Sequence, residues 1–274
     1  SDTRRTRAVT FGLLRRWGHI LGLSQTRCVH CLRPFLPAAR SCDAAADNDL
    51  AGAAAPLCPE CRALFAPYRG PRCPRCGLPT AEARASGQEA AFSRPDPGSR
   101  CGRCLNEDPP WDGLACHGLY CGALRDALLR LKFDGELSLA PLLGACLLEA
   151  SRCLPRPDAL LAMPQYPAHL RRRGFNQAHE LAKALHWLTG LPLRPELLRR
   201  VRPGPPQAGL SAALRRRNVR DSFQGARQAS GLRLWLIDDV VTTGSTLAAA
   251  CLALRAAGAR EVRALAVART PKHD

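Results

Sequence analysis

From about residue 111 onward, apolar segments of strand length alternate with longer segments whose apolar residues recur at helical spacing. The pattern predicts strands at residues 114–120, 159–163, 232–237 and 262–268. It predicts helices at residues 124–132, 137–150, 176–189, 208–219 and 245–257, and Gly258 ends the last of them. Strands that alternate with helices form a parallel sheet with helices on both faces, so we expect an α/β domain.

The first 110 residues follow a different pattern. Residues 1–27 are basic and carry apolar side chains near helical spacing, which predicts an amphipathic helix or arm that packs, or that contacts a membrane surface or DNA. The region 28–110 is rich in cysteine, and its tracts 41–56 and 80–100 have the Ala, Gly, Ser, Pro and Asp content typical of loops. We therefore predict three parts, at 1–27, 28–110 and 111–274.

Eight of the 14 cysteines form four C-x2-C pairs: Cys28/Cys31, Cys58/Cys61, Cys73/Cys76 and Cys101/Cys104. Two such pairs can hold one Zn2+ in a closed tetrahedral site that stabilises a fold and leaves no open position for catalysis. The first two pairs are 26 residues apart and the last two are 24 apart, whereas 11 residues separate Cys61 from Cys73. We therefore expect a double zinc ribbon in which neighbouring pairs combine, with a cross-braced arrangement as the alternative.

A redox role for Cys73-Pro74-Arg75-Cys76 is a second alternative, because a thioredoxin-type dithiol has the same spacing. The other six cysteines lack pair spacing and are expected to be buried free thiols. Arginines interrupt the apolar core that a secretory signal would need near the start of the sequence. No apolar run reaches the roughly 20 residues of a spanning helix. These features predict a protein without a transmembrane segment, located in a reducing cytoplasm.

The balance of charges favours a polyanionic partner. The chain has 40 Lys and Arg against 23 Asp and Glu, which gives a formal net charge of +17 and a pI near 10.0. Nucleic acid and phosphorylated metabolites both fit such an excess. A genome that uses arginine freely would give the same net charge without any such partner, so the charge alone does not identify nucleic acid or a phosphorylated metabolite as the ligand. The aromatic content of 5% argues mildly against a platform for stacked bases.

Residues 234–246 carry the clearest functional pattern. A buried strand runs into two carboxylates, Asp238 and Asp239, and a Thr/Gly/Ser loop then opens a helix. Backbone N–H groups at such a helix start can bind a phosphate monoester, and Gly244 lets the backbone approach it closely. The carboxylates suit sugar hydroxyl groups or Mg2+. A ribose 5-phosphate satisfies both ends, whereas an acidic pair before an ordinary helix cap is the non-functional alternative.

Two strings of residues resemble known families. Ile237-Asp238-Asp239-Val240-Val241-Thr242-Thr243-Gly244-Ser245-Thr246 resembles the phosphoribosyl pyrophosphate (PRPP) motif of type I phosphoribosyltransferases. Arg172-Arg173-Gly174-Phe175-Asn176-Gln177 resembles the narrower ComF family, in which a double zinc ribbon precedes a phosphoribosyltransferase domain. Shorter matches are Leu131-Lys132-Phe133, Gln207 with Leu210, and Arg217-Asn218 ahead of Phe223. The resemblance spans residues 28–269.

The resemblance implies a five-stranded, Rossmann-like parallel core that binds PRPP at the carboxyl ends of its strands, with Mg2+ on the pyrophosphate. Asp238 and Asp239 would be the catalytic pair and would hydrogen-bond the ribose hydroxyl groups. The 5-phosphate would lie in a cradle formed by Thr242, Thr243, Gly244, Ser245 and Thr246.

On the pyrophosphate side, the resemblance implies contacts from the loop after Met163-Pro164 and from Arg173 and Arg217, the latter in a flexible loop that closes over the leaving group. Many relatives have Lys or Arg a few residues after this proline, where the chain has Ala168 and His169. The arginines of segment 171–173 are the candidates to substitute for that missing cation.

Two functions compete. The first is a Mg2+-dependent phosphoribosyltransferase, an enzyme of pentosyl transfer, with an unidentified acceptor such as a nucleobase; positioning and charge neutralisation would supply the catalysis. The second is a non-catalytic protein that handles single-stranded DNA with its zinc ribbons and its basic segments 171–173 and 215–217. Members of the ComF family are linked to natural competence. That link implies a role in DNA uptake or utilisation, with competence or recombination proteins as partners.

Overall fold

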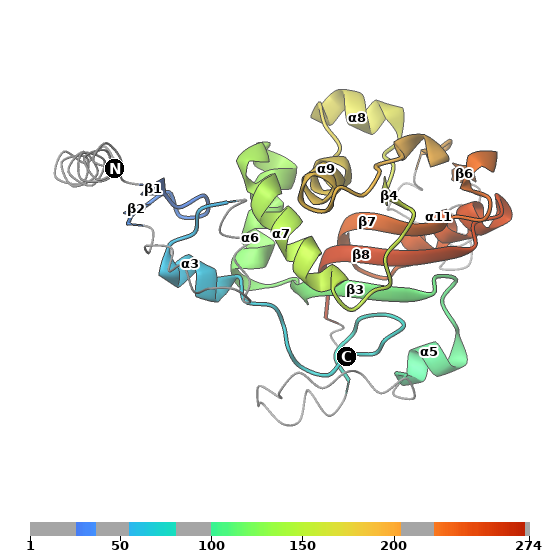
Figure 1. Ribbon diagram of the computed structural model, residues 1–274, viewed down its shortest axis with the longest axis horizontal. Helices are drawn as coiled ribbons and strands as arrows, with labels where there is room; N and C mark the ends of the chain where they lie inside the picture. Colours follow the sequence, from blue (N-terminus) through green and yellow to red (C-terminus); the bar gives the residue numbers. More distant parts are fainter. Residues whose placement is uncertain (1–25, 37–54, 81–99, 204–221, 272–274) are drawn as a thin grey trace, which may run out of the picture. The chain divides into compact units, whose positions relative to one another are not determined.

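The structure is a computed structural model that describes residues 26–36, 55–80, 100–203 and 222–271 (Figure 1). The chain forms two compact units that divide between Leu64 and Phe65. In the smaller unit, strands β1 (Thr26–Arg27) and β2 (Pro34–Phe35) pair antiparallel on either side of the first C-x2-C turn. Helix α3 (Pro59–Leu64) begins directly after Cys58. Within the described ranges, no helix combines the length and apolar character that crossing a membrane requires.

The larger unit is built on a four-stranded parallel sheet with the strand order β3-β8-β7-β4. The strands are β3 (Gly113–Leu119), β4 (Ala159–Ala162), β7 (Arg233–Val241) and β8 (Glu261–Arg269). The middle of β7 is a continuous apolar run in which residues 234–237 are at most 5% exposed. Such a run is typical of a parallel strand that is covered on both faces.

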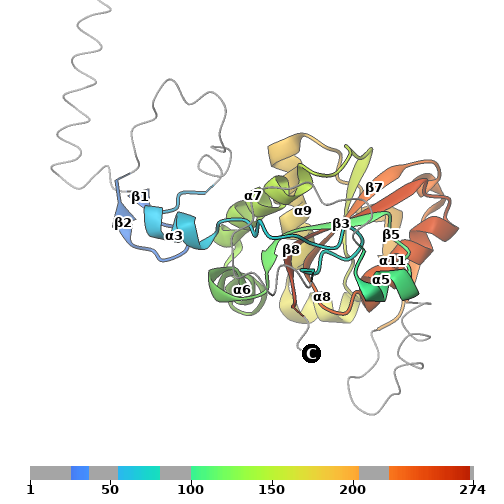
Figure 2. The same cartoon turned by 90° about the horizontal axis from the view of Figure 1, so that it is seen from below.

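Helices α7 (Ala140–Ser151) and α9 (Gln177–Thr189) pack side by side on one face of the sheet, and α11 (Ser245–Ala256) covers the other (Figure 2). Gly144 permits the close approach of α7 to α9, because a Cβ there would lie 2.5 Å from the Cβ of Ala184. Helix α6 (Gly122–Leu129) follows β3 and continues into a π-helical turn, Arg130–Asp134. Short 3-10 turns span Leu137–Leu139, Pro195–Leu197 and Arg227–Ala229.

The fold class is confirmed as an α/β domain with a parallel sheet and cysteine-rich clusters toward the N-terminus. The predicted strands and helices from residue 111 onward are confirmed within a few residues, except for helix 208–219, which lies outside the described residues, as does most of the arm at 1–27. Strand β7 continues beyond its predicted end at residue 237, because Asp238 and Val240 pair with Ala266 and Ala268 of β8.

Several short elements were not predicted. They are α5 (Gly102–Asn106), α8 (Pro167–Arg173) and an antiparallel hairpin of β5 (Leu198–Arg200) and β6 (Phe223–Gly225). Each is too short to show a clear apolar period. The implied five-stranded core has four strands in the described part of the chain, and a single parallel bridge between Leu160 and Leu193 occupies the place of the fifth.

The division between Leu64 and Phe65 leaves the second cysteine cluster in the larger unit. The second cluster folds with the sheet because Arg72 donates hydrogen bonds to the carbonyl oxygens of Cys116 (2.6 Å) and His117 (3.2 Å) on β3. Trp111, 5% exposed, further joins the cysteine-rich segment to the sheet by donating a hydrogen bond to the carbonyl oxygen of Arg75. The limits 1–27, 28–110 and 111–274 stay predictions.

Candidate functional site

Asp238 and Asp239 lie at the carboxyl end of β7, where parallel α/β sheets place their ligands. Their carboxylates are fixed locally: the Asp239 N–H donates to Asp238 Oδ1 (2.9 Å), and the Val240 N–H donates to Asp239 Oδ1 (2.8 Å). Burial, followed by the charge of Asp239, raises the pKa of Asp238 well above its ordinary value. Without a ligand, the site therefore resists carrying two negative charges.

The ComF-like string 172–177 connects the carboxylates to the opposite wall of the site. Gln177 Nε2 donates to Asp239 Oδ2 (3.3 Å), while Gln177 Oε1 accepts hydrogen bonds from Gln165 and from Arg173 Nη1 (2.9 Å). Asn176 accepts a hydrogen bond from the Ala178 N–H as the N-cap of α9, and its amide donates to the Met163 carbonyl (3.0 Å). These amides therefore fix the distance between the ends of β4 and β7.

A cavity of about 590 Å3 opens at this edge of the sheet. Five predicted site residues line it: Asp238, Asp239, Thr242, Thr246 and Arg173. Thr243, Gly244 and Ser245 connect the two lining threonines but do not line the cavity themselves, and Arg217 lies outside the described residues. The remaining charged or titratable lining groups are His169, Lys132, Arg172, Arg200 and Tyr120. The cavity thus joins two carboxylates to a predominantly cationic wall.

Arg200 is the site residue that sequence reasoning missed. It ends β5 and lines the cavity, and its Nε is buried without a hydrogen-bond partner in the described part of the chain. Burial lowers the pKa of Arg200, while the nearby Asp238 carboxylate opposes that shift. Gln165 Oε1 is also buried and without a described partner. Two polar side chains of the cavity wall thus each keep a buried atom without a hydrogen bond in the described part of the chain, which is uncommon in folded proteins.

The loop Thr242–Thr246 has the conformation expected of an anion cradle. Gly244 adopts a left-handed conformation (φ +80°) and serves as the N-cap of α11. The Ser245 N–H donates to Thr243 Oγ1 (3.3 Å), and the Thr243 and Ser245 hydroxyl groups lie 3.0 Å apart. Because α11 begins here, the other N–H groups of its first turn and its positive dipole end lie next to these hydroxyl groups. We call residues 242–246 the phosphate loop.

The eight paired cysteines form two groups, Cys28, Cys31, Cys58, Cys61 and Cys73, Cys76, Cys101, Cys104. This is the predicted sequential combination, and the cross-braced alternative is wrong. Within each group all Sγ atoms lie within 4.8 Å of one another; the Sγ atoms of Cys31 and Cys58 are 3.8 Å apart, and those of Cys76 and Cys101 are 3.6 Å apart. A tetrahedron with Zn–S bonds of about 2.3 Å has sulfur atoms about 3.8 Å apart, so both groups fit Zn2+.

In the second group, burial and hydrogen bonds between the cysteines shift the pKa values of the thiols in opposite directions. A hydrogen bond from Cys76 lowers the pKa of Cys73 to about 4, while burial raises the pKa of Cys104 to about 12. One thiolate therefore forms among thiols that cannot all ionise together unless a cation compensates them. A redox dithiol needs only two cysteines, so a cluster of four favours the metal site over the redox alternative.

The chain is 36% identical over 205 residues to DNA utilization protein YhgH of Salmonella typhi, which covers 72% of this chain and 84% of that protein. It is 35% identical over 178 residues to competence protein F of Haemophilus influenzae, covering 62% of this chain and 78% of that protein. No family model matches the chain.

Solved structures with a similar region include the glutamine PRPP amidotransferase of B. subtilis in complex with ADP and GMP, at 23% identity and a TM-score of 0.35, covering 50% of this chain and 30% of that one. They also include Leishmania donovani UMP synthase, at 24% identity and a TM-score of 0.27, covering 49% of this chain and 22% of that one.

The identity to the YhgH proteins and to competence protein F, over most of their length, shows that the chain belongs to the ComF family.

Proposed function

We propose that the chain binds PRPP together with Mg2+ in the 590 Å3 cavity and transfers the phosphoribosyl group to an acceptor. The observation that carries this proposal is the meeting of three groups in one cavity. The carboxylate pair suits the hydroxyl groups of ribose, the phosphate loop suits the 5-phosphate, and the cationic wall suits pyrophosphate. A ribose with a phosphate at each end matches these groups in order.

The cationic wall would also compensate for the Lys or Arg that many relatives have shortly after the proline and that this chain lacks after Pro164. His169 lines the cavity, and Arg172 and Arg173 from α8 lie there with it. Arg200 adds a cation from the β5 hairpin, which lies far along the chain from α8. These side chains would neutralise the pyrophosphate in place of the missing Lys or Arg.

Transfer requires that the bond between ribose C1 and the pyrophosphate oxygen breaks, with its electron pair leaving on pyrophosphate, while a lone pair of the acceptor forms the new bond to C1. A proton on the attacking acceptor atom is then released to water. The carboxylates of Asp238 and Asp239 would hold the ribose by its hydroxyl groups, and Gln177 would keep Asp239 oriented. Bound Mg2+ would supply further neutralisation of the pyrophosphate charge. The arginines of the wall would stabilise the same charge as it develops on the leaving group.

The test is Mg2+-dependent release of pyrophosphate from PRPP by the zinc-loaded protein, with a panel of nucleobases and with single-stranded DNA as acceptors. We expect release with at least one acceptor and its loss in the Asp238→Asn/Asp239→Asn variant. PRPP binding without release for any acceptor would contradict the transferase and favour a ligand-binding protein.

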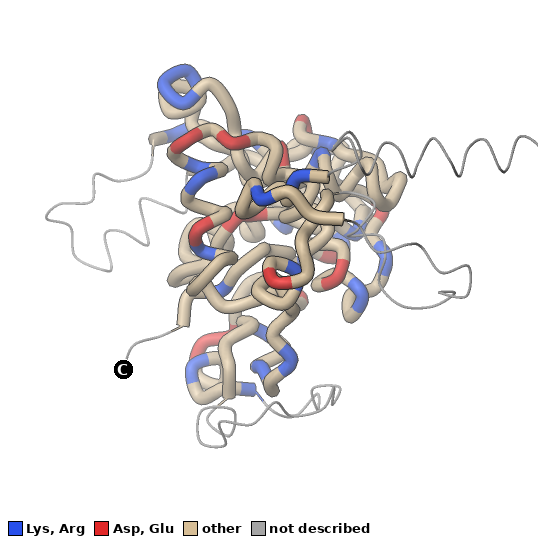
Figure 3. Tube along the Cα trace, turned by 90° about the vertical axis from the view of Figure 1, so that its left-hand side faces the viewer, with Lys and Arg blue, Asp and Glu red and all other residues tan. Residues whose placement is uncertain are grey.

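The names of the relatives, DNA utilization protein and competence protein F, support a role of this chemistry in DNA uptake or utilisation. A non-catalytic protein for single-stranded DNA is less well supported. Arg172 and Arg173, two of the arginines considered for DNA, line the cavity. Basic and acidic positions are also interspersed along the described chain in the view of Figure 3. Single-stranded DNA binding that falls steeply with salt, and that Arg200→Met leaves unchanged, would support the DNA function instead.

A further inference from the structure

One buried arginine connects the phosphate loop to the second cysteine cluster. Arg269 ends β8 and is 2% exposed. Its Nη1 donates hydrogen bonds to the carbonyl oxygens of Val241 (2.6 Å) and Thr242, and its Nε donates to the carbonyl oxygen of Cys76 (2.9 Å). A single planar guanidinium therefore binds the backbone carbonyls of Thr242, the first residue of the loop, and of Cys76, a cysteine of the cluster.

Two further contacts run between the same parts. Arg103, which lies between Cys101 and Cys104, donates from Nη2 to the carbonyl oxygen of Thr243 (3.2 Å). The ring of Trp111 packs against Gly244, where a Cβ would lie 3.0 Å from Trp111 Cη2. The indole N–H of Trp111 donates to the carbonyl oxygen of Arg75, which lies between Cys73 and Cys76. Both C-x2-C turns of the cluster are thus connected to the loop: the first through Trp111 and Arg269, the second through Arg103.

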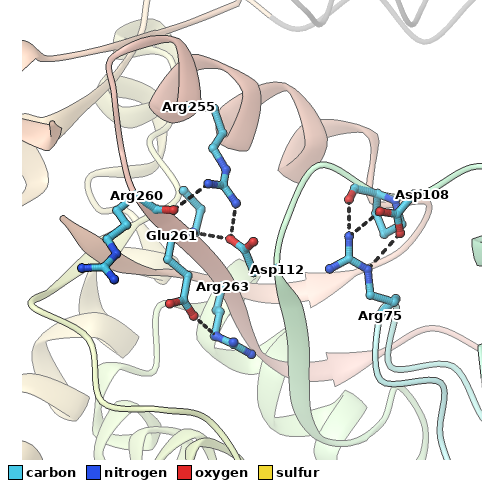
Figure 4. Close-up of polar contacts among 9 residues, drawn as sticks. Arg75, Asp108, Asp112, Arg255, Arg260, Glu261 and Arg263 are labelled. Carbon is cyan, nitrogen blue, oxygen red and sulfur yellow. Dashed lines mark hydrogen bonds and ion pairs between the residues drawn. The ribbon is translucent and has the colours of Figure 1, made fainter. Parts of the chain in front are cut away.

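The position of Trp111 is itself fixed on the sheet. Its neighbour Asp112 accepts hydrogen bonds from Arg255 of α11 and from the Val262 N–H of β8 (2.8 Å) (Figure 4). On the other side, Arg75 forms an ion pair with Asp108 (2.9 Å), and Figure 4 shows the two pairs in neighbouring segments. The backbone at Trp111 is therefore held by its neighbour Asp112, and the indole N–H is held by the Arg75 carbonyl. The C-x2-C turn that contains Arg75 thus helps to set the position of the ring against Gly244.

None of Arg269, Arg103 and Trp111 lines the cavity, so these contacts hold the loop from outside it. The carbonyl oxygens of Val241, Thr242 and Thr243 all accept hydrogen bonds from arginine side chains. Peptide groups whose oxygens are held on one side direct their N–H groups toward the other, which is the requirement for an anion cradle. The two guanidinium groups also add positive charge behind the place where a phosphate would bind.

We propose that a metal ion in the second cysteine cluster holds the phosphate loop in its anion-binding conformation, with Arg269, Arg103 and Trp111 as the positioning residues. Four sulfur ligands would fix both C-x2-C turns, and with them the Cys76 carbonyl, the Arg75 carbonyl and the Arg103 side chain. The identity of the phosphate ligand rests on the function proposed above, but the coupling between cluster and loop does not.

The test compares two matched variants of the full chain, Cys101→Ser and Cys31→Ser, because each replaces the partly exposed cysteine of its cluster. Two quantities are measured beside the zinc content: hydrogen exchange of the backbone amides at residues 243–247, and the affinity for PRPP with Mg2+. Each variant should lose about one equivalent of zinc per chain. Only Cys101→Ser should accelerate exchange in the loop and weaken PRPP binding by about tenfold, the equivalent of one lost hydrogen bond to a charged group. Equal effects of the two variants, or no effect of Cys101→Ser, would overturn the proposal.

A second pair keeps the test decisive if Cys101→Ser fails to fold. Arg103→Ala removes the contact with Thr243 and leaves all eight cysteines, whereas Arg100→Ala removes a nearby arginine whose described partner is Asp108 (3.5 Å). Arg103→Ala should retain two equivalents of zinc yet accelerate loop exchange and weaken PRPP binding several-fold, and Arg100→Ala should do neither. Wild-type behaviour of Arg103→Ala would contradict the proposed contact. If wild-type protein binds no PRPP, the proposed function fails, and the exchange data still decide the coupling.

Discussion

Gly244→Ala perturbs the phosphate loop at the point where backbone conformation and packing constrain the same residue. A left-handed conformation at φ +80° costs an L-residue about 1–2 kcal/mol. In addition, the new Cβ would lie 3.0 Å from Trp111 Cη2, closer than an ordinary contact, and Trp111 is held by its hydrogen bond to Arg75. Overpacking of this kind costs about 1–3 kcal/mol. We expect the variant to lose about 2–5 kcal/mol of unfolding free energy, the sum of the two terms.

Gly190→Ala is the matched control, because Gly190 has φ +68° and a Cβ there would meet no atom within 4 Å. It should lose only the backbone cost of about 1–2 kcal/mol. Urea unfolding of zinc-loaded protein measures both values, and calorimetric titration measures PRPP affinity. Gly244→Ala should weaken PRPP binding and Gly190→Ala should not, because only the first lies in the loop. Equal losses of stability for the two variants, together with unchanged PRPP affinity, would refute both the contact with Trp111 and the role of the loop.

Three further predictions test other parts of the site. Because the pKa of Asp238 is raised in the folded, ligand-free protein, unfolding free energy should fall as the pH rises above about 4, and Asp238→Asn should be more stable than wild type at pH 7 in urea unfolding. Arg200→Met should weaken binding of PRPP but leave that of ribose 5-phosphate unchanged in parallel titrations, since this cation would contact only the pyrophosphate. Cys28→Ser and Cys73→Ser should each lower the zinc content by about one equivalent per chain, measured by elemental analysis, and unchanged content in either would contradict the cluster assignment.

The sequence predicts those parts of the site whose residues lie close together along the chain. The acidic pair and the phosphate loop form one continuous string, and the regular spacing of the C-x2-C pairs was enough to group the cysteines correctly. The parallel sheet was predictable because its strands are buried on both faces and therefore read as uninterrupted apolar runs.

The parts that could not be predicted depend on contacts between distant segments. Arg200 is one of several arginines in the segment 199–202, and nothing in the sequence distinguishes the one that lines the cavity. Arg269 follows a strand that was predicted to end at residue 268, so its reach to both Cys76 and Thr242 appears only when β8 lies beside β7. Helix α8 is seven residues long and buries none of them, so it left no apolar pattern.

The central claim is that the cavity at the end of β7 binds PRPP. Its most direct test is a calorimetric titration of the zinc-loaded protein with PRPP, with and without Mg2+, beside the Asp238→Asn/Asp239→Asn variant. The account predicts binding of one PRPP per chain that is stronger with Mg2+ and is lost in the variant. No binding by the wild-type protein, or binding that the double substitution leaves unchanged, would contradict it.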